Sequence, residues 1–277
     1  MSLKVIFKLG KTIDKQLEEE YKTKLKKYLP HRLSVLRDVR TSYIRRKELS
    51  VNAATPTIGD LCRLPMVKSI LLDTPAAVEV SKRHFKPLIK SFDSTISQWC
   101  QNVDNQLLEM MHQSYASYPD LVPETALNLA TTFFSCSNHK EYDCCKKFLP
   151  YPQVLRHVCA FKEPGDKDEV VEGQARGPEE HVLLHGLGRT EHHWNASQAI
   201  SFQPKVFQLM TAVVELCGYD PRTTTGKDMD QANPIIECTA CNDPGIGRAI
   251  LTWSTVVRAQ QSNYSSLTPP ICSSNIS

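Results

Sequence analysis

Residues 136–159 read CSNHKEYDCCKKFLPYPQVLRHVC, and this stretch carries the strongest indication of the fold in the chain. It brings six side chains with soft or borderline donor atoms into a short segment: Cys136, His139, Cys144, Cys145, His157 and Cys159. Thiolates and imidazoles are the ligands that zinc prefers in proteins. The density of donors therefore predicts a bound zinc ion.

The residues between these donors indicate a hairpin followed by a helix. Residues 131–136 favour a β-strand, and residues 144–148 favour a second strand that returns beside it. Pro152 suits the first turn of a helix that carries His157 and Cys159. Two ligands from a hairpin and two from a helix are typical of small zinc modules. We predict as ligands Cys136, Cys145, His157 and Cys159, with Cys144 or His139 as substitutes.

The final pair of donors, His-x-Cys, departs from a two-Cys, two-His finger. Two side chains at this spacing cannot share one face of a regular helix, so Cys159 is expected where the helix ends. Four protein ligands close the coordination sphere, so the zinc is structural and no catalytic residue is predicted. Two alternatives remain open: buried thiols without metal, and a redox switch that uses the adjacent pair Cys144–Cys145.

Composition and charge describe an ordinary globular protein with a basic start. The chain has 277 residues, of which 41% are hydrophobic, and a net charge of +3. Residues 1–50 hold 14 Lys and Arg against 6 Asp and Glu, which gives this region a charge of +8. Such a region is compatible with nucleic acid or an acidic partner, and equally with a solvated helical surface.

The expected location is intracellular, either cytoplasmic or nuclear. The first residues, MSLKVIFKLG, do not resemble a signal peptide, and no apolar stretch is long enough to span a membrane. Ten cysteines without a secretory signal favour a reducing compartment, where clustered Cys and His residues bind metal. No small-molecule substrate is evident.

Residues 1–118 are predicted to form a helical region. Apolar residues recur at helical spacing from Leu17 onwards, and Pro30 implies either a helical hairpin or one kinked long helix. Residues 85–111 keep a 3.6-residue period throughout and form the strongest predicted helix. The predicted fold class is α+β, mainly α, with an N-terminal helical bundle followed by two small hairpin-plus-helix modules.

The first of these modules covers residues 119–160, and residues 161–193 are expected to be a flexible linker or insertion. The second module, 194–262, has a helix and then a strand with the pair Cys238-x-x-Cys241. This pair forms a weaker candidate metal site because only Cys272 follows it. His192 and His193 are expected to be exposed, and residues 263–277 to form a disordered tail.

Several blocks resemble a family of uncharacterised proteins of mushroom-forming fungi. The blocks are LATTFFSC, YPQVLRHVC, VVELCGYDPRTTTGKDMD and ECTAC followed by GRAILTWSTVV, within residues 56–160 and 194–258. Some members are described as F-box-like or as carrying Cys/His zinc fingers, and the family has no established activity. The resemblance implies the same four ligands. This chain departs from the family where a His usually follows the last block, because Arg258 and its neighbours lie there.

The expected function is a zinc-binding, non-enzymatic protein that acts as a protein-interaction or adaptor module. The alternative is a nucleic-acid-binding protein that uses the basic N-terminal helices and the finger-like modules. The helix expected over residues 152–159 would offer only Gln153 and Arg156 to a nucleic acid, which is little for sequence readout.

Overall fold

The structure of the chain is a computed structural model. It describes residues 3–49, 53–114, 125–137, 148–163, 178–243, 247–253 and 255–256; for residues 3–22, 24, 178–181, 238–243 and 247–249 it describes the backbone alone. The described part is mainly helical and contains two small antiparallel sheets. None of its helices is both long and apolar enough to cross a membrane.

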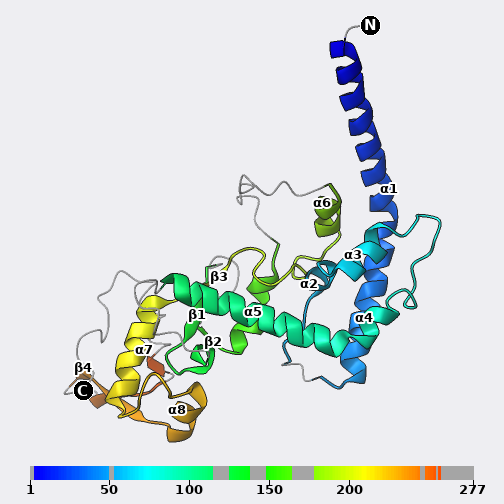
Figure 1. Cartoon of the computed structure of the whole chain (residues 1–277). Coiled ribbons are helices and arrows are strands. Elements are labelled where there is room, and N and C mark those ends of the chain that lie inside the picture. Colours follow the sequence, from blue (N-terminus) through cyan, green and yellow to red (C-terminus); the bar gives the residue numbers. More distant parts are fainter. Residues whose placement is uncertain are drawn as a thin grey trace. The chain divides into compact units, whose positions relative to one another are not determined.

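The chain divides into two compact units, and each is built from two separate stretches of sequence. Unit 1 comprises residues 1–100 and 161–197, and unit 2 comprises residues 101–160 and 198–277. The helices of unit 1 are α1 (Leu3–Arg46), α2 (Ile58–Cys62), α3 (Pro65–Leu72), α4 (Lys86–Lys90) and α6 (Pro178–His185). Helix α5 (Phe92–Ser114) begins in unit 1 and continues into unit 2 (Figure 1).

Helix α1 settles the two alternatives for the N-terminal region, because it continues through Pro30 as one helix (Figure 1, blue). Pro30 is exposed, so its ring and the missing N–H face solvent rather than the core. The turns on both sides of Pro30 bury an apolar stripe that includes Leu29, Leu33 and Leu36, each at most 1% exposed. This stripe packs in one core with residues of α2, α3, α4 and α6.

Arg32 lies inside this apolar core with 1% of its surface exposed. Its guanidinium donates hydrogen bonds to the carbonyl oxygens of Leu71 (2.7 Å), Thr74 (2.7 Å) and Pro75 (3.1 Å). It also lies 4.1 Å from the centre of the Tyr28 ring. The last carbonyls of a helix have no hydrogen-bond donor within the helix. Arg32 supplies donors to carbonyl oxygens at the end of α3 and in the turn after it.

The sequence predicted a linker over residues 161–193, and the structure places the second half of this range in unit 1. Helix α6 contributes Val182 and Leu183 to the same core as α1. Residues 186–194, here called the strap, then contact both α1 and α2. Arg37 of α1 donates three hydrogen bonds to the Glu191 carboxylate: Nε–Oε1 at 2.8 Å, Nε–Oε2 at 3.1 Å and Nη2–Oε2 at 2.6 Å. Residues 164–177 of the expected linker lie outside the described residues.

The strap touches α2 at its first turn. Thr57 and Asp60 form a capping box, and the second carboxylate oxygen of Asp60 accepts the backbone N–H of Trp194 at 3.0 Å. The N–H of Gly59 donates to the carbonyl of Glu191 at 2.7 Å. His192, expected to be exposed, is 2% exposed because this close backbone contact places it inside the unit.

The pair Arg37–Glu191 should make the stability of unit 1 depend on pH. Hydrogen bonds from Arg37, and then that from the N–H of Gly188, hold the pKa of Glu191 below its ordinary value of 4.5. A depressed pKa in the folded state stabilises the fold above about 4.5, and this contribution is lost as pH falls through the folded-state pKa. Both side chains are about one-third exposed, so we expect Glu191→Gln to lower the free energy of unfolding by about 1 kcal/mol at pH 7.

The measurement is denaturant unfolding of the wild type and Glu191→Gln between pH 7 and pH 3. The difference between the two proteins should shrink as pH falls. A matched control is Asp38→Asn, because Asp38 forms an ion pair 3.7 Å long with Lys82 on an exposed surface. A difference for Glu191→Gln that stays constant over this pH range would contradict the assignment.

Unit 2 contains both sheets. Strand β1 (Phe133–Cys136) pairs antiparallel with β2 (Leu149–Pro150) on one side and with β3 (Ile200–Phe202) on the other. Strands β4 (Ile235–Asp243) and β5 (Gly247–Thr252) form a second, two-stranded sheet. The remaining elements are the 3₁₀ helices η2 (Ala126–Asn128), η4 (Gln153–Arg156) and η5 (Val158–Phe161) and the helices α7 (Pro204–Leu216) and α8 (Gly226–Ala232).

Local signals explain where α7 and α8 begin and where α7 ends. Pro204 lies in the first turn of α7, and Gly218 follows its end with φ of +81°, a conformation that suits glycine. Thr225 caps α8 with a capping box. Helix α7 buries Met210 and Val213 in a core that also holds Trp253. The expected helix after β5 and the expected tail lie almost entirely outside the described residues.

Candidate metal centre

The candidate metal centre begins at the end of β1. This strand lies in the middle of the three-stranded sheet, and its register pairs Cys136 with Ile200 of β3. Phe134, which is fully buried, lies two residues earlier and so on the same face of the strand. The apolar face that buries Phe134 therefore also takes the Cys136 side chain inside, where its exposure is 0%.

The other two donors come from the turn after β2. The expected helix over residues 152–159 is replaced by two short 3₁₀ helices, η4 and η5, which are separated by His157. The backbone of His157 is extended, with φ of −65° and ψ of 120°. Its N–H donates to the carbonyl of Val154 at 3.3 Å, and its own carbonyl accepts the N–H of Ala160 at 2.9 Å. On a continuous helix, side chains at the His-x-Cys spacing would point in different directions. The break at His157 allows His157 and Cys159 to point toward the same centre.

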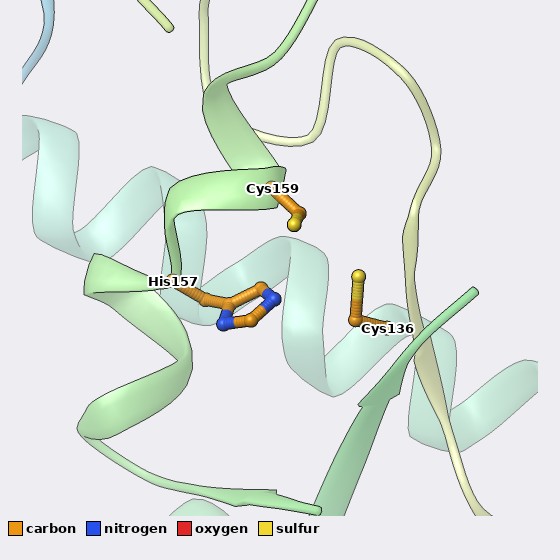
Figure 2. A group of neighbouring side chains, drawn as sticks. All are labelled: Cys136, His157 and Cys159. Atoms are coloured by element: carbon orange, nitrogen blue, oxygen red, sulfur yellow. The ribbon is translucent and has the colours of Figure 1, made fainter. Parts of the chain in front are cut away.

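Cys136, His157 and Cys159 converge on one point. Their ligand atoms all lie within 4.8 Å of one another, and their side chains point toward a common centre (Figure 2). Cys136 and Cys159 are 0% exposed and His157 is 8% exposed. Ligand atoms around a tetrahedral zinc ion are separated by about 3.5–3.8 Å, given Zn–S and Zn–N distances of about 2.3 and 2.0–2.1 Å. A contraction of at most about 1 Å therefore brings the three side chains to coordination distance.

The donor set and its surroundings suit a metal ion with borderline softness. Two thiolates and an imidazole disfavour Mg²⁺ and Ca²⁺, which take oxygen ligands. Val154, Leu155 and Ala160, which neighbour His157 and Cys159 in sequence, are also buried and apolar. The described residues thus form a buried Cys136–His157–Cys159 group that could hold a metal ion.

Asp104 of α5 anchors the chain just before η4. Its carboxylate oxygen Oδ2 accepts a hydrogen bond from the Tyr151 hydroxyl at 3.3 Å. Burial raises the pKa of Asp104, and the hydrogen bond from Tyr151 opposes this rise. The contact positions the start of the turn that carries His157, and Asp104 does not belong to the group of three donors.

Three of the four predicted ligands are therefore brought together. The fourth, Cys145, and its substitutes Cys144 and His139 lie outside the described residues. Their segment starts at residue 138, two positions after Cys136, and ends at residue 147, next to Phe148. Cys145 is three residues from Phe148, a chain length that reaches at most about 10 Å.

The second predicted pair, Cys238 and Cys241, lies on strand β4. The backbone of Cys238 is opposite Ala249 of β5, and the pairing becomes irregular between Cys238 and Asp243. The side chains of both cysteines lie outside the described part, so this site stays a prediction. Among the described residues, the group at Cys136 is the candidate that meets the geometric requirement for a metal site.

Comparison of the chain with models of protein families, with curated proteins and with solved structures found no match.

Proposed function

We propose that the protein is a non-enzymatic zinc-binding protein in which Cys136, His157 and Cys159 hold a structural zinc ion. Cys145 is the proposed fourth ligand. The observation that carries this proposal is the convergence of three buried donors from β1 and from the η4–η5 turn. Four protein ligands leave no open coordination position, which is the condition for a structural rather than a catalytic ion.

Zinc is the proposed metal because the donor set matches it best. Zinc accepts mixed sulfur and nitrogen ligands in a tetrahedron and does not change its oxidation state. Its role here is to join β1 to the η4–η5 turn, two elements with few residues of regular structure. Strand β2 has two residues and η4 has four, so backbone hydrogen bonds alone constrain this region weakly.

The experiment is elemental analysis of the purified native protein and of matched variants. We expect one zinc per wild-type chain, which is lost in His157→Ala and retained in Cys241→Ser. Cys145→Ser should also lose the ion, whereas Cys144→Ser should retain it. A folded wild-type protein without zinc would contradict the proposal, and retention in His157→Ala would remove His157 from the ligand set.

The zinc also fixes a surface for a protein partner in this proposal. The residues of the η4–η5 turn alternate between buried and exposed positions. The exposed ones are Pro152, Gln153, Arg156 and Val158. Val158 is apolar, lies between two of the proposed ligands and is 43% exposed. An apolar residue with polar neighbours on a rigid turn is the arrangement that protein interfaces use at their centre.

Val78 offers a matched control for this surface, because it is equally exposed at 43% and lies in unit 1. A photoreactive amino acid at Gln153 would be cross-linked to partners in cells, and the cross-linked proteins identified by mass spectrometry. The expected partner is lost with Val158→Asp and kept with Val78→Asp. Equal recovery with both variants would contradict a role for this turn.

A further inference from the structure

The two cysteines of the metal centre are also close enough for a second kind of bond. Their Sγ atoms lie within 4.8 Å of each other, compared with about 2.05 Å in a disulfide. A zinc ion between them would hold the sulfurs about 3.8 Å apart. We propose that zinc and a Cys136–Cys159 disulfide are mutually exclusive occupants of this site, so that oxidation releases the metal. This inference rests on the zinc site proposed above.

The chemistry needs an oxidant, and a small disulfide such as oxidised glutathione suffices. One thiolate attacks a sulfur of glutathione disulfide, which forms a mixed disulfide and releases one glutathione thiolate. The second protein thiolate then attacks the protein sulfur of that mixed disulfide and releases the second glutathione thiolate. The two cysteines lose two electrons and glutathione disulfide gains them. Zinc leaves because two of its three proposed thiolate ligands are consumed.

The geometry favours this pair over the adjacent cysteines Cys144 and Cys145, which the sequence pattern suggests as a redox switch. The Cα atoms of consecutive residues are about 3.8 Å apart, below the range of about 4.4–6.8 Å in which disulfides form without distortion. Cys136 and Cys159 come from different elements, β1 and η5, and their sulfurs already converge.

Burial determines how fast the reaction proceeds. Both sulfurs are 0% exposed, so an oxidant reaches them only when the η4–η5 turn opens locally. Bound zinc opposes this opening because it binds the closed form. With free zinc at ten times its dissociation constant, we expect disulfide formation to slow about tenfold.

The test treats the native zinc-loaded protein with oxidised glutathione, blocks the remaining thiols, and digests without reduction. Trypsin together with glutamyl endopeptidase yields residues 125–140, which contain Cys136, and residues 157–162, which contain Cys159. Cys100 and the pair Cys144–Cys145 fall on other peptides. The expected product links these two peptides, and one zinc is released for each link. Cys62, whose pKa burial raises to about 12, should remain unlinked.

The outcomes separate this inference from the proposed function. A protein that contains zinc before treatment but gives no linked peptide, or gives a Cys144–Cys145 disulfide instead, overturns the inference and leaves the zinc site standing. A protein without zinc before treatment overturns the proposed function. Cys136→Ser should abolish the link, while the wild-type peptide map decides the question even if that variant does not fold.

Discussion

Removing zinc from the wild-type protein is expected to unfold the region around β1 and the η4–η5 turn, and Cys159→Ser is expected to have the same effect without a chelator. Cys159 is 0% exposed and its sulfur belongs to the convergent group. Zinc that binds only the folded state at 1,000 times its dissociation constant contributes about 4 kcal/mol to stability. This is a large part of the total for a domain of ordinary stability.

The measurement is hydrogen exchange followed by mass spectrometry, with and without chelator. Chelation should increase exchange in residues 133–136 and 148–161 of the wild type and have no further effect on Cys159→Ser. Cys217→Ser is the matched control, because Cys217 is half-buried in the same unit and outside the donor group. If Cys159→Ser and Cys217→Ser exchange alike, the metal does not stabilise this region.

Gly59→Ala is expected to be the most destabilising small substitution in unit 1. A Cβ at this position would lie 2.6 Å from the carbonyl oxygen of Glu191 and 2.6 Å from the backbone nitrogen of His193. Backbone atoms cannot rotate away as a side chain can, so the strap must separate from α2. Overpacking typically costs about 1–3 kcal/mol, and a clash with backbone atoms should lie at the upper end of this range.

Thermal unfolding and hydrogen exchange would test this expectation. Gly59→Ala should raise exchange in residues 57–62 and 186–194 and lower the melting temperature of unit 1. Gly226→Ala is the control, because a Cβ there would meet its nearest atom, on Trp253, at 3.8 Å, and alanine favours the helix in which it lies. Unchanged exchange in Gly59→Ala would show that the strap does not lie against α2.

The candidate metal centre could be predicted from sequence because the donors themselves carry the signal. Cys and His residues at this density are unusual, and three of the four preferred ligands converge. The local backbone could not be predicted as well. The residues YPQVLRHVC have good helical spacing, and nothing in that spacing indicates the extended His157 that separates the two 3₁₀ helices.

The organisation of unit 1 was less accessible to sequence reasoning. Arg37 and Glu191 are 154 residues apart, and nothing near either residue identifies its partner. The sequence of the strap is polar and contains glycine, so it resembles a linker. The strap is held by hydrogen bonds to Gly59 and Asp60 of α2, and it has no apolar periodicity that a sequence could reveal. At Pro30 the local signal was misleading. Proline favours a break in a helix, but α1 continues through it because the apolar stripe before and after Pro30 packs in one core.

Unit 1 is built from two stretches of sequence that are separated by part of unit 2, and this limits when unit 1 can finish folding during synthesis. Its first stretch ends at Cys100, but Glu191 and Trp194, which contact α1 and α2, are made roughly 90 residues later. At a synthesis rate of about 5–20 residues per second, the ribosome needs about 5–20 s to cover that distance. Residues 136–159 emerge within this interval, so the proposed metal ligands leave the ribosome before the N-terminal helices can acquire their last contacts.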